Sequence, residues 1–518
     1  MASEAGDTSS PLPTADVGSA GAAVIARQDR IPIWSLSYLF IGIIGIGFLF
    51  TFFDIFDITV SFIQTCTQIV PGCSSANAAG SLGLPVELNL AGYVIGALIL
   101  SPLADRFGRR DILLLTLLLT GIGSLYTVFV NDYTGFIIAR IITGIGIGAD
   151  LAIVNTYINE VAPSSSRARY TSLIVVMSAL GAFFGIWLGL WLTTPAASFP
   201  NGLPFALATV NITASGAQFV GNGWRIMYGI GAVLALVGIL LRFQLPESPR
   251  WLIARGRIQE ADAIVTNMEE RARKKVPNLP APAAELPVHK SAASVPYTEI
   301  FRNSLYLRRT ILLVVVWFLG YVTVYAIAQG LTSMLASILP APPHLPPAAA
   351  AAAVAGEAGM IAALGTFGFI AATIFAFFFG ERLERKLWLP IAAVLTLIGG
   401  LLIAIFASSN FALAAIGSII TFFGFNLWIP MTYTWSTESY PTRVRATGFA
   451  LVDGVGHLGG GVGILLIAPL IPALLSSLGP TTGPIVIFVI IAAFLIVAAI
   501  IAQFGTATRQ KRLDEVSP

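Results

Sequence analysis

Charged side chains inside long apolar stretches are the residues of this sequence most able to do chemistry. Asp54 and Asp57 lie in one such stretch, close enough in sequence to share one face of a helix. Two neighbouring carboxylates repel each other, and binding one proton relieves the repulsion. We therefore predict that this pair takes part in proton coupling. The alternative is a solvated pair near the outer end of the helix.

Two further charges lie in another apolar stretch. Arg140 needs an acidic partner because a lone guanidinium inside a membrane is very costly, and Asp54 or Asp57 is the natural one. Alternatively, Arg140 binds an anionic substrate through paired N–H donors. Asp150 follows about 15 Å further along a helix, near the membrane centre. We predict that it joins the proton-coupling group and contacts substrate; the alternative is a structural aspartate bonded to neighbouring helices.

Other polar and aromatic residues in the apolar stretches are candidates for binding a solute. Asp453 and His457 share a helix face, and histidine titrates near neutral pH; the alternative is a neutral imidazole in a buried hydrogen bond. The full set of predicted substrate-binding residues is Asp150, Asn155, Trp317, Tyr321, Tyr325, Gln329, Asn426 and His457.

The composition indicates a membrane protein. Of the 518 residues, 56% are hydrophobic and 11% are charged, whereas a soluble domain is about 25% charged. The net charge of +3 is too small to indicate a nucleic-acid partner. Apolar stretches near the length that crosses a bilayer, about 20 residues, occur at 37–60, 88–104, 112–130, 134–158, 170–193, 225–244, 310–338, 357–380, 388–408, 410–434, 446–470 and 482–504. The predicted fold class is therefore an all-α polytopic membrane protein with twelve transmembrane helices.

The basic residues gather in the loops on one side of these spans. By the positive-inside rule, we predict that both termini are cytoplasmic and that the protein crosses the plasma membrane. The predicted domains are a disordered tail at 1–36, a six-helix bundle at 37–244, a linker with amphipathic helices at 245–309, a second six-helix bundle at 310–504 and a tail at 505–518.

The predicted outside loops carry few charges. Cys66 and Cys73 lie in one of them, where an oxidising environment permits a disulfide. We predict that they form one; the alternative is two free thiols. The Ala- and Pro-rich stretch at 339–356 is predicted to be a flexible loop.

The two predicted bundles repeat each other at their cytoplasmic ends. Glu381 follows Asp105 by 276 residues, and Glu438 follows Glu160 by 278. Each acidic helix end is followed by two arginines, Arg167 and Arg169 or Arg443 and Arg445. Two parallel repeats of six helices are typical of transporters that bind solute between their halves.

Opposite charges at these helix ends predict a gate that closes the cytoplasmic side in one state and parts in the other. The predicted gate residues are Asp105, Arg109, Glu160 and Arg169 in the first half, and Glu381, Arg385, Glu438 and Arg445 in the second. The alternative is that the basic loops fix orientation and nothing more.

Three motifs resemble those of a known superfamily. SPLADRFGRRD from Ser101 resembles the loop 2–3 motif of the major facilitator superfamily, with Ser101 in place of the usual glycine. PESPRWL from Pro246 resembles the sugar-porter motif, and TESYPTRVRATG from Thr437 resembles sugar porters and the aromatic-acid and synaptic-vesicle-protein-like symporters. The resemblance covers about 37–504 and implies a twelve-helix secondary transporter with alternating access.

Departures from the sugar-porter pattern leave the substrate open. The paired glutamines usual in helix 7 are reduced to Gln329, and the Gly-Arg of helix 11 is Gly456-His457. The acidic pair of FFDIFDI and the GIGIGAD stretch are more similar to the proton–phosphate symporters. The proline of the drug-antiporter motif is missing after Gly181, Gly185 and Gly189, which argues against multidrug efflux.

The resulting prediction is proton-coupled uptake of a small polar solute, such as an organic or inorganic anion or a sugar. One alternative is a uniporter with structural carboxylates. Another is a transporter-like nutrient sensor, although the tail after Phe504 is short for such a receptor. The sequence has no metal cluster, nucleophile triad or nucleotide loop, so we predict no enzyme activity, metal or cofactor. The expected partners are the solute, protons and the lipid bilayer, and we expect a monomer.

Overall fold

Twelve stretches of the structure are helical, long and apolar enough to cross a membrane. The computed structural model describes residues 16–73, 78–200, 202–213, 216–282, 296–441, 444–511 and 513–517. The spans lie in α2 (Tyr38–Phe56), α4 (Ala78–Phe107), α5 (Arg109–Phe129), α6 (Tyr133–Val161), α7 (Arg167–Thr193), α8 (Gly223–Arg242), α12 (Ser304–Ala328), α14 (Pro347–Phe379), α15 (Trp388–Phe406, entered through η2, Arg385–Leu387), α16 (Phe411–Leu427) with α17 (Ile429–Glu438), and both arms of α18 (Arg445–Ala502). The prediction of a twelve-helix membrane protein is therefore confirmed.

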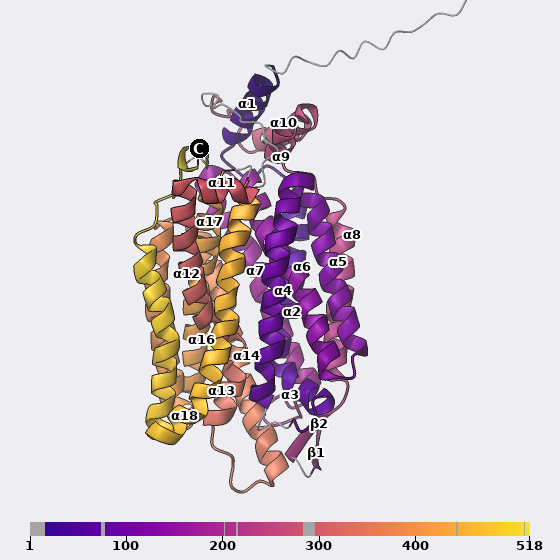
Figure 1. Cartoon of the computed structure of the whole chain (residues 1–518), viewed down its shortest axis with the longest axis vertical. Helices are drawn as coiled ribbons and strands as arrows, with labels where there is room; N and C mark the ends of the chain where they lie inside the picture. The colour runs from indigo at the N-terminus through magenta and orange to yellow at the C-terminus, as the bar shows by residue number, and fades with distance from the viewer. Residues whose placement is uncertain are drawn as a thin grey trace, which may run out of the picture.

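The spans form two bundles that stand side by side (Figure 1). The N-terminal half contains α2 to α8, and the C-terminal half contains α12 to α18. The two halves meet chiefly where α4 contacts α18 and where α7 contacts α14. The space between the halves is therefore bounded by these two pairs of helices.

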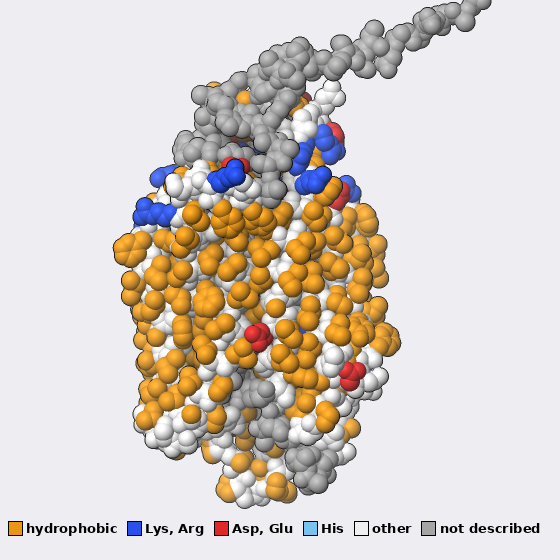
Figure 2. All heavy atoms as spheres, viewed as in Figure 1, with side chains coloured by type: hydrophobic (Ala, Val, Ile, Leu, Met, Phe, Trp, Pro, Cys, Tyr) orange, Lys and Arg blue, Asp and Glu red, His pale blue; other side chains and the backbone are white. Residues whose placement is uncertain are grey.

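A broad hydrophobic belt crosses the face of the molecule shown in Figure 2, and Lys and Arg gather at one end of it. We call this the basic end. Both described chain ends lie there, as an even number of spans requires. The opposite end carries the hairpin of β1 (Thr209–Thr213) and β2 (Gly216–Val220), and we call it the hairpin end.

Glycines bring α4 and α6 into direct backbone contact. A Cβ atom built on Gly144 would overlap the carbonyl oxygen of Asn89, and one built on Gly148 would overlap that of Tyr93. In the other direction, a Cβ on Gly96 would overlap the carbonyl oxygen of Ile145. Small residues allow this close approach of membrane helices, so the helix that carries Arg140 is packed tightly against α4.

The last two spans are joined by a very short turn. Gly479 has a φ of 79° and interrupts α18. Residues other than glycine rarely adopt this left-handed conformation, so the chain reverses there without a long loop.

A group of short helices covers the basic end: α1 (Asp16–Asp29), α9 (Pro249–Ala254), α10 (Ile258–Arg273) and α11 (Pro296–Arg302). Helix α1 occupies part of the region predicted to be disordered, so the structure corrects that prediction for residues 16–29; residues 1–15 lie outside the described part. Tertiary contacts explain why these residues are helical. Val24 of α1 is buried against α9, and Arg27 bonds to Asp262 and Glu269 of α10.

The end of the chain also packs on the bundles. Trp435 donates its Nε1–H to the carbonyl of Thr506 at 2.9 Å, and Thr508 donates its hydroxyl to Glu438 at 2.6 Å. A last short helix, α19 (Leu513–Val516), follows. Of the predicted linker at 245–309, residues 283–295 lie outside the described part.

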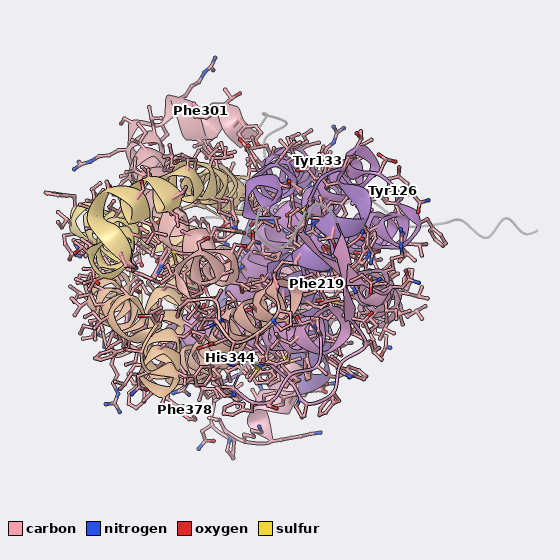
Figure 3. All side chains as sticks on the ribbon, turned by 90° about the horizontal axis from the view of Figure 1, so that it is seen from below. Tyr126, Tyr133, Phe219, Phe301, His344 and Phe378 are labelled. Carbon is pink, nitrogen blue, oxygen red and sulfur yellow. A yellow bond between two sulfur atoms is a disulfide. The ribbon has the colours of Figure 1, made fainter. Side chains whose placement is uncertain are left out.

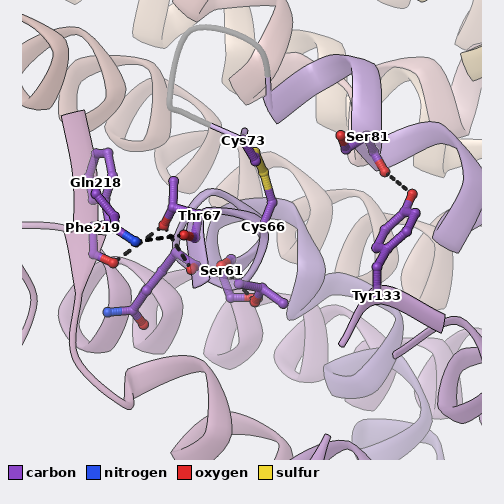
Figure 4. Close-up of a disulfide and its surroundings, with 10 residues drawn as sticks. Ser61, Cys66, Thr67, Cys73, Ser81, Tyr133, Gln218 and Phe219 are labelled. Carbon is purple, nitrogen blue, oxygen red and sulfur yellow. Dashed lines mark hydrogen bonds between the residues drawn. A yellow bond between two sulfur atoms is a disulfide. The ribbon is translucent and has the colours of Figure 1, made fainter. Parts of the chain in front are cut away.

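The hairpin end is held together by side-chain bonds around α3 (Ile58–Ile69) (Figure 4). Cys66 and Cys73 form a disulfide, as predicted. Gln218 of β2 donates to the carbonyl of Thr67 at 2.9 Å, and the β1–β2 register pairs Gln218 with Asn211. The hairpin is thus tied to α3 at the edge of the N-terminal half.

Two helices at this end differ from the prediction. α13 (Leu331–Ile338) follows α12, and α14 begins at Pro347, inside the stretch predicted to be a flexible loop. Proline is favourable in the first turn of a helix and alanine has the highest helix propensity. The run of alanines after Pro347 therefore extends the span as helix.

Candidate functional site

A small cavity lies between the halves. Its wall is formed by Phe52, Ile55, Phe56 and Leu151 of the N-terminal half and by Tyr321, Val324, Tyr325, Ala328, Gln329, Phe369, Ile429, Tyr433 and His457 of the C-terminal half. The volume is about 30 Å³, comparable with the volume of one water molecule. A larger solute therefore requires the halves to move apart.

Aromatic rings form most of this wall and continue behind it. Trp317 stacks on Tyr321 and Tyr433 with centroid separations of 4.9 and 5.1 Å. Its Nε1–H donates to Ser436 at 2.9 Å. Trp317 therefore holds two wall residues in place without lining the cavity itself.

Asp453 connects this wall to the other half. It is fully buried and accepts hydrogen bonds from the hydroxyls of Tyr321, at 3.0 Å, and Tyr93. Tyr93 belongs to α4, whereas Tyr321 belongs to α12, so the carboxylate joins the two halves. His457 lies between both tyrosine rings, with centroid separations of 3.8 and 3.9 Å. Its Nδ1 is 2.8 Å from the backbone carbonyl oxygen of Asp453 and 3.5 Å from the carboxylate of the same residue.

Arg140 and two carboxylates form a second buried site inside the N-terminal half. Its Nη1 lies 3.4 Å from Asp54 and 3.7 Å from Asp57, and its Nη2 donates to the backbone carbonyl of Asp54 at 3.0 Å. Ser124 donates to Asp54 at 2.6 Å. Both aspartates are 0% exposed and Arg140 is 1% exposed. The structure thus brings together three of the four residues that we assigned to proton coupling.

Asp150 lies in a different group and has its own arginine. Its carboxylate is bound by Arg242 at 2.5 and 3.1 Å, and Thr116 donates to it at 2.9 Å. Thr51 adds a contact at 3.4 Å. Arg242 comes from the end of α8 and also donates to the carbonyl of Leu113 at 2.7 Å. This is the geometry of the structural alternative named above: an aspartate that joins α2, α5, α6 and α8.

The basic end carries the same ion-pair pattern in each half. Arg109 lies 2.9 Å from Asp105 and 3.0 Å from Glu160. Arg385 lies 2.8 Å from Glu381 and 3.3 Å from Glu438. Both arginines are 1% exposed or less, so the sequence repeat is also a repeat in space.

Acidic residues of each half also bind the other half. Asp105 accepts hydrogen bonds from the backbone N–H and hydroxyl of Thr447, at 3.1 and 2.7 Å, near the beginning of α18. Glu381 accepts one from the N–H of Ala168, near the beginning of α7, at 2.9 Å. An acid from each half thus neutralises the partial positive charge of a helix N-terminus in the opposite half.

Two arginines complete these contacts between the halves. Arg445 lies 3.7 Å from Glu160, and Arg167 lies 3.8 Å from Glu438. The prediction named Arg169 instead, but Arg169 is exposed and lies over the ring of Phe377 at 5.7 Å. The signal for Arg167 was available, because Arg445 follows it by 278 residues, the same offset that relates Glu438 to Glu160. Arg443 lies outside the described residues.

The hairpin end is bridged as well. Gln329 donates to the carbonyl of Ile55 at 3.1 Å, and Thr59 donates to that of Ala328 at 3.4 Å. Further out, Trp187 donates to Thr366 at 3.2 Å. The cavity is therefore closed toward both ends of the molecule.

The predicted substrate-binding residues divide into two groups. Tyr321, Tyr325, Gln329 and His457 line the cavity. Asn155 instead donates to the carbonyl of Leu151 at 2.7 Å, and Asn426 to that of Phe369 at 3.2 Å, so these amides stay within or between helices. The prediction missed Tyr93, Tyr433, Arg242 and the phenylalanines of the wall; their spacing in the sequence does not distinguish them from other residues of apolar helices.

The PESPRWL stretch contributes Glu247 to the basic end. Its carboxylate accepts backbone hydrogen bonds from Arg109 at 3.1 Å, Arg110 at 3.2 Å and Ser248 at 2.8 Å. Burial raises the pKa of Glu247, and these bonds act in the opposite direction. The motif thus fixes the beginning of α5, where Arg109, a predicted gate residue, lies.

Two parallel bundles of six spans, a closed cavity between them and ion pairs that join their ends define a secondary transporter of the major facilitator superfamily type. The chain belongs to the sugar (and other) transporter family, whose model matches residues 40–518. The expectation drawn from the sequence motifs is therefore confirmed.

Individual relatives show how broad this family is. The niacin transporter NiaP of Acinetobacter baylyi is 26% identical over 510 residues, which cover 95% of this chain and 99% of the relative. The 4-hydroxybenzoate transporter PcaK of the same species is 26% identical over 382 residues, covering 73% of this chain and 74% of the relative. The solved proton:xylose symporter XylE of E. coli shares the fold with a TM-score of 0.66 at 19% identity, covering 93% of this chain and 99% of XylE. The family and these relatives are transporters and not enzymes.

Proposed function

We propose that the protein is a proton symporter that takes up a small organic solute by alternating access. The basic end is cytoplasmic by the positive-inside rule, so both termini lie in the cytoplasm and the hairpin end faces outward. The protein works as a monomer in the plasma membrane. The structure corresponds to an intermediate of the cycle in which the solute site is closed on both sides.

The observation that carries proton coupling is an uncompensated charge. The buried group of Asp54, Asp57 and Arg140 contains two carboxyl groups and one guanidinium, so its fully ionised form has a net charge of −1. Burying an unpaired charge costs several kcal/mol, and one proton removes it. Asp150 and Arg242 form a pair of one carboxyl group and one guanidinium, without such an imbalance.

The position of this charge favours linkage to the solute. Asp54 and Asp57 flank Ile55 and Phe56, which line the cavity. When the halves part, movement of α2 relative to α6 changes the distances from Arg140 to the two carboxylates. A site whose proton affinity differs between the two conformations is what coupling requires.

The wall of the cavity favours a flat solute. Aromatic rings dominate it, and aromatic faces stack well on other flat rings. Gln329 and His457 supply polar groups at the same wall. We propose a small aromatic or heteroaromatic acid as the substrate, a class consistent with the niacin and 4-hydroxybenzoate relatives. A pentose is the second candidate, because sugar rings also lie against aromatic side chains and a proton:xylose symporter shares the fold.

Uptake by the full-length protein in proteoliposomes tests the proposal. Labelled niacin, 4-hydroxybenzoate and xylose are offered with the lumen alkaline relative to the bath. We expect one acid to accumulate and a proton ionophore to abolish the accumulation. Asp57→Asn should lose accumulation but retain counterflow exchange, which moves no net proton. Glu357→Gln is the matched control, because Glu357 is a membrane carboxylate of α14 outside the Arg140 group.

Other outcomes decide between the alternatives. If solute enters through the wild-type protein only down its own gradient, at a rate independent of the pH gradient, the protein is a uniporter and the symport proposal is overturned. Proton-driven accumulation that survives in Asp57→Asn places coupling elsewhere. Accumulation of xylose alone replaces the aromatic acid with a sugar.

A further inference from the structure

A long apolar groove lies on the outer surface of the C-terminal half, at its basic end. It is formed by Leu307, Ile311, Leu312 and Val315 of α12 together with Ile501 of the last turn of α18, and Ser304 and Arg308 stand at its mouth. The cavity has a volume of about 520 Å³. Ile311 is 58% exposed, so the groove is open to the surroundings of the bundle and not to the central cavity.

The dimensions of the groove match one leaflet of a bilayer. From Ser304 to Val315 the wall descends along one face of α12 by about 16 Å, at 1.5 Å per residue. Half of a hydrocarbon core is about 15 Å. Since Ser304 is the first residue of a membrane span, the groove begins at the membrane surface and ends near the middle of the bilayer. A lipid acyl chain fits this depth.

The mouth of the groove favours a negative charge. Arg308 is exposed and makes no hydrogen bond or ion pair within the described residues, although its neighbour Arg309 is bonded to Ser439 and Val516. The first turn of α12 contains no acidic residue. The side chain of Asn303 already caps the N–H groups of Leu305 and Tyr306, at 3.0 and 3.4 Å, so the beginning of α12 adds only its partial positive charge. The hydroxyl of Ser304 has no hydrogen-bond partner in the part of the chain that the structure describes.

Helix α11 extends the same surface. Phe301 is 51% exposed and lies at the periphery of the bundle, beside the helices of α18 (Figure 3). Arg302, next to it, is exposed and is likewise unpaired in the described ranges. Phe504, just beyond Ile501, is 74% exposed. An exposed aromatic beside a basic residue is typical of the interface between lipid tails and headgroups.

We propose that this groove binds one anionic phospholipid from the leaflet at the basic end. An acyl chain lies along Leu307, Ile311 and Val315, and the phosphate is held by Arg308 and the hydroxyl of Ser304. The unpaired cations select an anionic headgroup over a zwitterionic one, because a zwitterion brings its own ammonium to the same place. The proposal does not depend on which solute the protein carries.

The bound lipid has a structural consequence for the seam between the halves. Tyr297 of α11 donates to the carbonyl of Leu98, in α4, at 2.5 Å. Helix α11 thus belongs to the C-terminal side of the linker but contacts the N-terminal half. Because only Asn303 separates α11 from α12, a phosphate held at the beginning of α12 also restrains α11 and so favours the state in which the basic end is closed.

Native mass spectrometry of the detergent-purified full-length protein tests the proposal. The probes are phosphatidylglycerol and phosphatidylcholine with identical acyl chains. We expect the wild-type protein to retain one more phosphatidylglycerol than phosphatidylcholine. Arg308→Gln should lower its affinity for phosphatidylglycerol by about tenfold, the loss of roughly one charge-assisted hydrogen bond, and leave phosphatidylcholine unaffected. Ile311→Trp, which fills the groove, should lower retention of phosphatidylglycerol as well.

The matched control is Arg382→Gln. Arg382 is also an exposed arginine at the basic end of the C-terminal half, but it lies over Phe379 at 4.6 Å and is not among the residues that line this groove. The Arg382→Gln variant should bind both lipids as the wild-type protein does. Equal retention by Arg308→Gln and the wild-type protein overturns the site. Equal retention of the two lipids, or displacement of phosphatidylglycerol by excess inorganic phosphate, overturns an anionic lipid as the occupant.

Discussion

The two halves of the molecule repeat each other at the basic end and differ inside the membrane. Arg109 and Arg385 bind equivalent acids, and each half caps a helix of the other. Inside the membrane, the N-terminal half contains Arg140 and Arg242 with their aspartates. In the C-terminal half, no arginine or lysine occurs at 310–381, 387–442 or 446–508, and its Asp453 is bound by tyrosines.

This difference separates two tasks. In the proposed cycle, opening and closing use the same contacts in both halves, and the ion pairs at the basic end are duplicated accordingly. We propose that the group of Asp54, Asp57 and Arg140 in the N-terminal half couples the proton; Asp453 in the C-terminal half is also a buried carboxylate without an arginine, and is the second candidate. Most of the residues that line the cavity belong to the C-terminal half.

The largest expected effect comes from breaking the ion pair of Asp150 and Arg242. Asp150→Asn leaves the buried Arg242 without its anion, which costs about 3–5 kcal/mol, a large part of the stability of a typical domain. We expect a poor yield and a lower melting temperature in detergent. The double variant Asp150→Leu with Arg242→Met should recover much of the loss, since it buries no charge. An unchanged melting temperature in Asp150→Asn would show that the pair does not stabilise the bundle.

The second prediction asks which half couples the proton. Asp453→Asn weakens the bonds from Tyr93 and Tyr321, each worth about 1.5–3 kcal/mol when the acceptor is charged. We expect KM for the solute to rise about tenfold or more while accumulation still follows the pH gradient. If Asp453→Asn instead loses gradient-driven accumulation and keeps counterflow, coupling belongs to Asp453 and His457.

The third prediction compares two neighbouring arginines at the duplicated end. Arg167→Ala removes a contact between the halves, but Glu438 keeps Arg385. We expect the open fraction at this end to rise by about tenfold, or ~1.4 kcal/mol, measured as the alkylation rate of a cysteine placed at Asn159. Arg169→Ala should change that rate less than about twofold, because Arg169 faces outward and exposed charges contribute little. Equal effects of the two substitutions would restore Arg169 as a gate residue.

The smallest expected effect concerns the docking of α1 on α10. Burial acts to raise the pKa of Glu269, but hydrogen bonds from Arg27 and Arg30 outweigh it and lower the pKa below the ordinary 4.5. The contact is therefore fully formed above about pH 4.5 and is lost as the pH falls through the lowered pKa.

Hydrogen exchange of residues 16–29 measures this effect. Protection should be constant from neutral pH down to about 4.5 and fall below it, after correction for the intrinsic exchange rate. Glu269→Gln should show weak protection at every pH. A wild-type protein that loses protection already near pH 6 would contradict the assignment to Glu269.

Sequence reasoning predicted the architecture well because it depends on local composition. The stretch at 134–158 corresponds to α6, which runs from Tyr133 to Val161, and the repeat at Glu160 and Glu438 returned as a repeat of ion pairs. The start of α4 was placed ten residues late, at 88 instead of Ala78. The first turns of this helix contain small and polar residues, and their helical state depends on packing against α6 and α18.

The ion pairs inside the membrane were predicted less well, because their partners come from helices that are far apart in the sequence. Arg140 has two possible partners within one helix turn, and the structure places it near both. Asp150 finds Arg242, 92 residues away, and nothing local distinguishes Arg242 from an arginine at a membrane surface. Only the relative rotation of α6 and α8 decides which face of each helix meets the other, and sequence spacing does not give that rotation.

The glycine contacts between α4 and α6 make these two helices one stiff mechanical part. At Gly144 and Gly148, the Cβ of any other amino acid would strike a backbone carbonyl of α4, so the two helices are in direct backbone contact with no side chain between them. Tyr93 of α4 contacts Asp453, and Arg140 of α6 contacts Asp54. In the proposed mechanism, a displacement of α4 at Tyr93 when the halves part therefore also displaces α6 at Arg140, and so links the release of solute to the release of the proton.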